Sequence, residues 1–340
     1  SILVYDKPYP LPDYSVIRSC CCKGLPVILS LFGTRPHTEI DTEFLEHDAI
    51  SFACLRNYQD VLKVLAQPSF CVGQENARRQ QSYGLLYACQ FGYVEILRLL
   101  SLPPYSLGHE DVVQVHGMFY ACKNGHLDII KMLLQPPFNV TDISTTCFEA
   151  ACEGGYLDVV NLLAGPPFNF GREDVCETRF DYEFDEYKEP QSIWLACTNG
   201  QVEILKRLCQ APFFVCREDI LAQRVFKAPF FVCREDILAH RVFIAACQKG
   251  YVEILKALAE PPLSLTGEDV RLESVFALTV ACEQGHAHVV ETLSQPPYSL
   301  GHEDAVEALS DVSVSIRDNE LIAVLAAPPY NYHVALRPPR

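Results

Sequence analysis

Two residue patterns in this sequence could carry chemistry. Sixteen cysteines, many at a recurring position, could bind a metal ion or exchange electrons. The run Gly108-His109-Glu110-Asp111 returns as Gly301-His302-Glu303-Asp304 and sets an imidazole beside two carboxylates. Such a group could bind a metal ion or transfer a proton.

The spacing of the cysteines favours packing over chemistry. Eight of them recur on a base period near 33 residues, with two longer intervals of 45 and 50, and each lies beside another small residue. A buried free cysteine behaves as a small apolar side chain. Sulfurs in stacked helices would lie about 10 Å apart, too far for a shared metal or a disulfide. Cys20, Cys21 and Cys22 are adjacent and lack metal-ligand spacing. The eight are Cys21, Cys54, Cys89, Cys122, Cys152, Cys197, Cys247 and Cys282.

The histidine and carboxylate motif also has a structural interpretation. Three consecutive residues do not converge easily on one ion, and acids suit the first turn of a helix. No nucleophile or oxyanion arrangement accompanies the motif, and the sequence holds no P-loop, dinucleotide fingerprint, G-x-S-x-G or H-E-x-x-H. We therefore predict no enzyme activity, no cofactor and no metal site.

Internal repeats indicate the architecture that positions these residues. LLYACQFGYVEILRLLSLPPY at 85–105 recurs in five further close copies, and weaker copies lie at 20–32, 51–70 and 313–330. We expect one repeat solenoid over 1–340, with an N-terminal extension at 1–19 and a degenerate first repeat at 20–49. Regular repeats would fill 50–312, and a degenerate repeat with a tail would fill 313–340. The further close copies begin at Met118, Phe148, Ile193, Phe243 and Leu278.

Two insertions interrupt the period. Residues 176–190 are acidic and aromatic, and residues 211–243 contain APFFVCREDILAQRVF followed after Lys227 by a copy that differs at one position, Gln223 against His240. A repeat of 33 residues has room for only one copy of this segment in its loop. One copy should therefore lie outside the regular stack of repeats as an extra helix or bulge.

Each repeat is predicted to form two short antiparallel helices. Gly92 can end the first helix in the left-handed conformation at little steric cost. Glu95 suits the start of the second helix, and Pro103-Pro104 stops it. The aromatic residue that follows the prolines, Tyr105 in this unit, would pack over the end of the helix pair; the alternative is a ladder of ligand-binding rings.

This pattern resembles the ankyrin repeat family, whose helix pair carries A-A-x-x-G-H-x-x-[IV]-[VL]-x-x-L-L. The resemblance covers roughly residues 20–330 and implies an all-α or nearly all-α solenoid of about nine helix-pair repeats. The family's T-P-L-H opening is replaced by YGLL at Tyr83 and HGMF at His116, and its G-A-D-V-N finger by the proline pair. We expect a short helix beginning near His109 in place of the β-hairpin finger.

Composition limits the partners. With 49% apolar and 21% charged residues the chain should fold, and a net charge of −16 disfavours nucleic acid and anionic membranes. A basic protein partner is the electrostatic expectation. The sequence contains no apolar run of membrane-spanning length and no recognisable signal peptide. We therefore expect a soluble chain in the cytoplasm or another reducing intracellular compartment.

The resemblance implies a protein-binding scaffold that uses its fingers and the two variable residues before each glycine. The alternative interpretation is that some of these residues only keep the surface soluble. The implied partner-binding residues are Leu55, Arg56, Gln90, Phe91, Lys123, Asn124, Glu153, Thr198, Asn199, Gln248, Lys249, Glu283 and Gln284.

A second hypothesis is a structural protein that assembles end to end. A solenoid needs polar terminal repeats to stay monomeric, and the first repeat, with Ile28 and Phe32, is apolar. Short apolar segments near both ends could add strands to a neighbour, through Ile2 and Val4 or through Val334 and Leu336. Contacts of this kind that do not close give filaments.

Overall fold

The structure is a computed structural model that describes residues 20–21, 23–32, 49–68, 70, 74–79, 82–176, 179–181, 186–188, 191–216, 219, 242–310 and 319–332. Its contacts divide the chain into unit 1, residues 1–147, and unit 2, residues 148–340, and each is described by itself. The terminal segments and most of both insertions, including the second copy of the duplication, lie outside the described residues.

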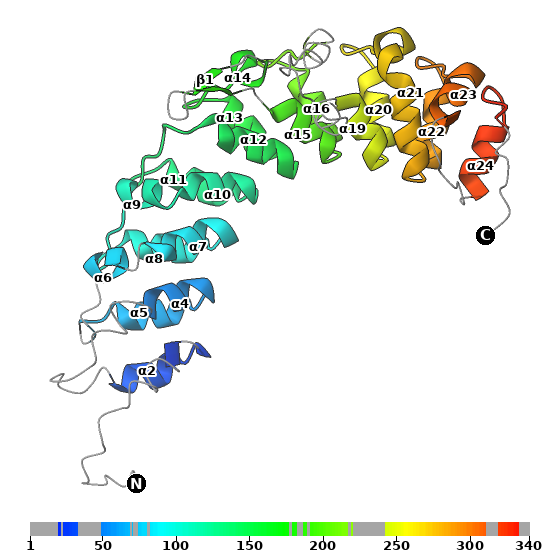
Figure 1. Cartoon of the computed structure of the whole chain (residues 1–340). Coiled ribbons are helices and arrows are strands. Elements are labelled where there is room, and N and C mark those ends of the chain that lie inside the picture. Colours follow the sequence, from blue (N-terminus) through cyan, green and yellow to red (C-terminus); the bar gives the residue numbers. More distant parts are fainter. Residues whose placement is uncertain are drawn as a thin grey trace, which may run out of the picture. The chain divides into compact units, whose positions relative to one another are not determined.

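Unit 1 consists of stacked antiparallel helix pairs (Figure 1). The first helices α4, α7 and α10 are neighbours in one row, and the second helices α5, α8 and α11 form the adjoining row. The elements are α2 (Pro26–Phe32), α4 (Ala49–Leu55), α5 (Gln59–Leu65), α6 (Gln74–Arg79), α7 (Tyr83–Phe91), α8 (Val94–Ser101), α9 (His109–Gln114), α10 (Gly117–Lys123) and α11 (Leu127–Leu133).

Unit 2 repeats the same pairing, and α12 (Thr145–Gly154) crosses the boundary between the units. Its other elements are α13 (Leu157–Ala164), α14 (Arg172–Cys176), β1 (Arg179–Asp181), β2 (Glu186–Lys188), α15 (Ser192–Thr198), α16 (Val202–Leu208), α19 (Val242–Lys249), α20 (Val252–Ala259), α21 (Gly267–Glu283), α22 (Ala287–Ser294), α23 (His302–Ser310) and α24 (Asn319–Ala326). The fold is the helix-pair solenoid architecture that the repeats predict.

The turn between the two helices of a pair takes the predicted conformation. Gly92 has φ +74°, and the next amide, that of Tyr93, donates to the Ala88 carbonyl at 2.9 Å. Asn57 takes the same place with φ +57°, as expected of the residue that tolerates this region best after glycine. The left-handed turn recurs at Gly24, Gly125, Gly155, Gly200, Gly250 and Gly285.

The eight register cysteines lie in the core between first helices. All are free thiols with almost no exposed surface, which confirms the packing prediction. Burial raises the pKa of Cys89 and of Cys282 to about 12, so these thiols stay protonated at neutral pH. The apolar faces of the second helices, such as Ile96, Leu97 and Leu100, complete this core.

The fingers are helical, as predicted. The amide of Gly108 donates to the Asp111 carboxylate at 2.9 Å, so the aspartate caps α9. Asp111 is only 4% exposed and accepts two hydrogen bonds from Arg78 of α6, at 2.8 and 3.1 Å. Where the motif is missing, at 141–144, no finger helix forms.

The same aspartate cap recurs at Asp174, Asp219, Asp269 and Asp304. In unit 2 the finger and the first helix of one repeat are continuous as α21, a helix of 17 residues. Strands occur among the described residues in the 176–190 insertion, where β1 pairs antiparallel with β2 and Phe180 lies opposite Tyr187.

The aromatic residue after the proline pair is a buried packing residue in most repeats, although Phe168 is only half-buried. Tyr105, Tyr298 and Tyr330 are at most 3% exposed, so their rings cannot form a ligand-binding ladder. Each hydroxyl also donates to a carbonyl of the preceding second helix, Tyr298 to Leu255 at 2.7 Å for example. The ring therefore joins two repeats, which the sequence did not indicate.

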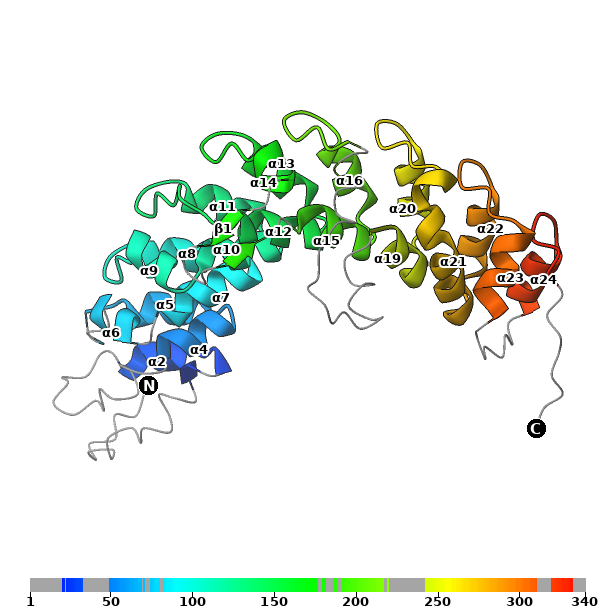
Figure 2. The same cartoon turned by 45° about the horizontal axis from the view of Figure 1, so that its top comes forward.

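A further set of hydrogen bonds, which we call the finger ties, joins four of the described fingers to the loop after each of them. Figure 2 shows the loops projecting beyond the second helices. The first finger residue donates to a main-chain carbonyl of the next loop, although its type varies. The finger ties are Gln74 to Ser106 at 2.8 Å, His109 to Phe138 at 2.7 Å, Arg172 to Phe214 at 2.7 Å and His302 to Tyr330 at 2.7 Å.

The residue after each turn glycine reaches back to the preceding repeat. His126 Nε2 lies 3.0 Å from the Gln90 carbonyl, and His286 Nε2 lies 3.0 Å from that of Gln248. The ring of His126 occupies the space beside Gly92, where a Cβ would lie 2.7 Å from its Nδ1. The glycine is thus required both for its backbone conformation and for this close approach.

Candidate functional site

The implied partner-binding residues all reach the surface, at the C-terminal ends of the first helices. Arg56, Phe91, Lys123, Glu153, Asn199, Gln248, Lys249, Glu283 and Gln284 are exposed, while Leu55, Gln90, Asn124 and Thr198 are half-buried. Three of them bond to their own helix: Asn124 donates to Tyr120, Asn199 to Leu195 and Thr198 to Trp194. The hydrogen-bonding groups of these three side chains are therefore partly occupied within the chain.

Helix α7 carries a stripe of aromatic rings along its surface. Tyr83, Tyr87 and Phe91 are four residues apart and so share one helix face, with ring centroids 6.2 and 6.3 Å apart. Tyr93 extends the stripe at 5.6 Å from Phe91. Tyr83 is 42% exposed and Phe91 43%, which is unusual for side chains of this size.

The neighbouring first helices continue the stripe. Phe52 of α4, Tyr87 of α7 and Tyr120 of α10 hold the same register position, two residues before the register cysteine, and each is half-buried. Phe119 meets Tyr120 edge to face at 5.4 Å. We call Phe52, Tyr83, Tyr87, Phe91, Phe119 and Tyr120 the aromatic surface.

The aromatic surface is specific to unit 1. The same register position in unit 2 holds Ala150, Leu195, Ala245 and Val280. Sequence reasoning identified Phe91 and missed the other five residues, because it considered only the variable pair before each glycine. The four-residue spacing on α7 and the register position shared by Phe52, Tyr87 and Tyr120 were the signals that could have found them.

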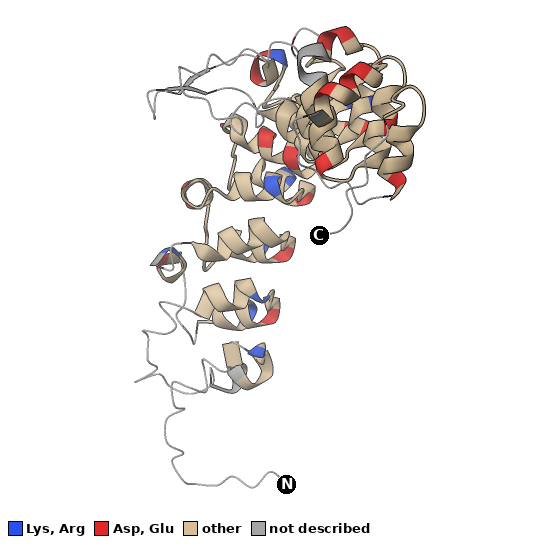
Figure 3. Ribbon diagram, turned by 45° about the vertical axis from the view of Figure 1, so that its right-hand side comes forward, with Lys and Arg blue, Asp and Glu red and all other residues tan. Residues whose placement is uncertain are grey.

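Charges around the aromatic surface are basic. Lys23, Arg56 and Lys123 lie exposed at the ends of first helices, and the Lys123 ammonium lies 5.8 Å from the centre of the Phe119 ring. Helices α4, α7 and α10 contain no aspartate or glutamate. In Figure 3 acidic segments are more frequent on the ribbon of unit 2 than on that of unit 1.

The second helices present a different surface. Ion pairs three residues apart lie along it, such as Lys63 with Asp60 at 3.1 Å and Lys256 with Glu253 at 2.6 Å. Exposed pairs of this kind add a few tenths of a kcal/mol to a helix. This surface is thus typical of a solvated helix face.

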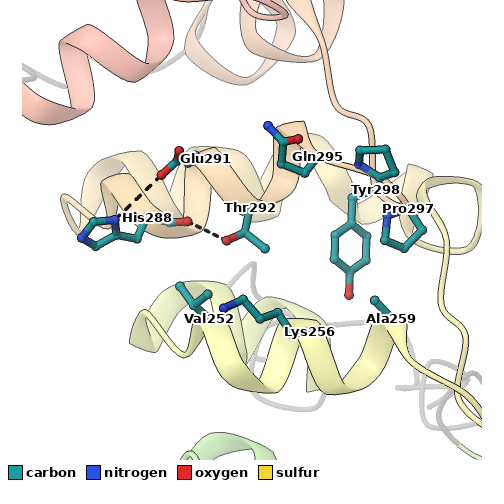
Figure 4. Close-up of a pocket in the computed structure, with 10 residues that line it drawn as sticks. Val252, Lys256, Ala259, His288, Glu291, Thr292, Gln295, Pro297 and Tyr298 are labelled. Atoms are coloured by element: carbon teal, nitrogen blue, oxygen red, sulfur yellow. Dashed lines mark hydrogen bonds and ion pairs between the residues drawn. The ribbon is translucent and has the colours of Figure 1, made fainter.

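One groove lies between α20 and α22 and has a volume of about 600 Å³ (Figure 4). Lys256, His288, Thr292 and the Pro296-Pro297 loop line it. His288 lies 3.9 Å from Glu291 and 3.8 Å from Glu320, and the Tyr298 hydroxyl is already bonded to the main chain. The groove therefore offers no activated nucleophile.

No three metal-ligating side chains converge within the described residues. His109 and His302 are held by the finger ties, and their neighbouring aspartates cap helices, so the repeated motif has the structural role that its position suggests. None of the described helices combines the length and the apolar composition needed to cross a bilayer.

Comparison with known proteins identifies the repeats. Residues 85–174 match the family model for ankyrin repeats, in three copies. The matched region contains the pairs α7 with α8, α10 with α11, and α12 with α13. A search of curated proteins finds no match to this chain. Ankyrin repeats indicate a scaffold for protein–protein interaction, and residues 85–174 are the part of the chain that the family model identifies as ankyrin repeats.

Proposed function

We propose that the chain is a non-catalytic scaffold that binds another protein through the aromatic surface of unit 1. The observation that carries this proposal is the continuous row of exposed and half-buried rings over α4, α7 and α10. Aromatic side chains dominate binding energy at protein interfaces because they bury a large area with few rotatable bonds. Two of the rings, those of Tyr83 and Phe91, are more than 40% exposed and so remain available to a partner.

The remaining implied residues act as a second, weaker contact. Glu153, Gln248, Lys249, Glu283 and Gln284 are exposed in unit 2 but have no aromatic neighbours in their register. Polar residues of this kind typically form the rim of an interface and tune its specificity.

The test replaces two exposed rings together, Tyr83→Ser with Phe91→Ser. Both side chains are more than 40% exposed, so the variant should stay folded by circular dichroism. Proteins in a cell extract that cross-link to the wild-type chain should be recovered with the double variant in amounts at least tenfold lower. Leu102→Ser is the matched control, because Leu102 is 51% exposed outside the first helices. Equal recovery by the double variant and the control would contradict the proposal.

A second candidate function, self-association, is favoured by the surface of α2 and the residues just before it. Leu25, Val27 and Ile28 are 37%, 73% and 42% exposed, and three adjoining apolar side chains are costly to leave in water. The other residues expected to take part lie outside what the structure describes: Ile2, Val4, Val334, Leu336 and the side chain of Phe32.

Ile28→Lys tests self-association. Charge on this face should weaken any contact between copies, while repeats that touch only their neighbours keep the rest of the chain folded. Sedimentation from low to high protein concentration should show growth for the wild type and its loss in Ile28→Lys. Leu102→Lys provides the same charge change elsewhere. A wild-type chain that stays monomeric at every concentration removes this candidate.

A further inference from the structure

We infer that the partner of the aromatic surface is an acidic protein segment with aromatic or other large apolar side chains between its carboxylates. The inference rests on the proposed function and names the chemistry of its partner. It reverses the expectation drawn from net charge, which favoured a basic partner.

The uneven distribution of charge along the chain is the first reason. Residues 148–340 carry 29 of the 43 carboxylates and 16 of the 27 basic residues, whereas residues 1–147 carry 14 carboxylates and 11 basic residues. The net charge of −16 therefore belongs largely to unit 2. It does not describe the electrostatics of unit 1.

The first helices of unit 1 provide the second reason. In the part that the structure describes, their ends carry Lys23, Arg56 and Lys123, and α4, α7 and α10 contribute no carboxylate. The equivalent ends in unit 2 carry Glu153 and Glu283 against Lys249. A basic partner would meet like charges on unit 1, whereas an acidic one would meet complementary charges.

Two of the three carboxylates in the first turns of the second helices α5, α8 and α11 form ion pairs. Asp60 and Glu95, in the first turns of the second helices, pair with Lys63 at 3.1 Å and Arg98 at 3.7 Å. Asp128 begins α11, which also contains Lys131. The cations of the first helices are therefore free to attract an approaching segment of opposite charge.

The mixture of rings and cations sets the second requirement for the partner. Lys123 lies over the Phe119 ring. Phe91 is the second residue after its register cysteine, a position that holds Lys23, Arg56 or Asn124 in the other repeats of unit 1. A purely acidic segment would leave the exposed rings of Tyr83 and Phe91 in water. Apolar side chains between the carboxylates would cover them, as in amphipathic peptides bound in grooves.

The chain itself supplies a suitable probe. A peptide of residues 176–190 contains six carboxylates, four aromatic residues and two basic residues. Its chemistry matches the inferred partner without any assumption about the partner's identity. A second peptide with each Asp and Glu replaced by Asn and Gln keeps the rings and removes the acidic charge.

The experiment measures binding of both peptides to the full chain by isothermal titration calorimetry. The acidic peptide should bind, and its affinity should fall at least tenfold in the double variant Arg56→Glu with Lys123→Glu and also at high salt. Lys206→Glu with Lys256→Glu is the matched control, because it makes the same charge change on second helices of unit 2, where no part of the inferred site lies. The control should bind as the wild type does.

Three results would overturn the inference. They are no binding of the acidic peptide, equal binding of the neutral peptide, and equal losses in the two charge variants. After any of these three results the proposed function is still supported if the double variant Tyr83→Ser with Phe91→Ser cross-links to fewer proteins than the wild type does. If that variant keeps them, the aromatic surface itself fails as a binding site. The two failures are thus distinguishable.

Discussion

Raising the pH from 8 to 10 under reducing conditions should lower the free energy of unfolding of this chain steeply. Burial holds the pKa of six register thiols well above the ordinary value, those of Cys54, Cys89, Cys122, Cys152, Cys197 and Cys282, with a hydrogen bond to Cys147 as the larger cause at Cys122. These groups stay protonated in the folded chain and ionise when it unfolds.

The sign follows from the raised pKa values. The stability is fully present below the ordinary thiol pKa, near 9, and is lost as the pH rises toward the folded-state value, about 12 for Cys89. Each thiol lowers the unfolding free energy by about 1.4 kcal/mol per pH unit in that window. For six thiols the loss by pH 10 is about 8 kcal/mol, comparable with the whole stability of an ordinary domain.

Urea denaturation followed by circular dichroism at pH 8, 9 and 10 measures this effect. Cys89→Ala should lose one thiol's share of the pH dependence, because its side chain no longer ionises in either state. A variant that keeps the full wild-type dependence would show that buried thiols do not cause the alkaline loss.

The substitution Gly92→Ala should destabilise unit 1 by about 2–4 kcal/mol. The left-handed conformation costs an alanine about 1–2 kcal/mol. The new Cβ would also lie 2.7 Å from the His126 ring and displace it from the Gln90 carbonyl, a loss of about 1 kcal/mol or more. Urea denaturation at neutral pH measures the change.

Two controls separate these causes. Gly301→Ala should be nearly neutral, since no atom lies within 4 Å of its Cβ position and its backbone is not left-handed. Adding His126→Ala to Gly92→Ala should make the two costs less than additive, because the steric conflict disappears with the ring. If the losses in unfolding free energy were fully additive, the His126 ring would not be in steric conflict with the side chain at position 92.

The sequence was sufficient for the architecture of each repeat. Small pairs, turn glycines and proline stops recur in register, and repetition turns weak local signals into a strong one. The helical finger followed from the apolar spacing behind His109 and from the missing β-hairpin sequence. These features are local, so a few residues determine them.

The contacts between repeats could not be read in the same way. Nothing in the spacing of Tyr298 shows that its hydroxyl meets Leu255 of the previous pair, because that contact depends on how far one pair is displaced from the next. The aromatic surface was missed for the same reason, since it exists only when Phe52, Tyr87 and Tyr120 are brought into one row. The net charge of the whole chain does not describe unit 1, because it averages over units of different composition.

The finger ties have a consequence for how such an array can lengthen. Glutamine, histidine or arginine serves as the donor, but the acceptor is always a main-chain carbonyl, which every residue possesses. The finger tie itself therefore does not depend on the type of side chain in the loop that follows. A repeat that is inserted, removed or exchanged would therefore still find an acceptor for its finger tie, whatever the sequence of the neighbouring loop.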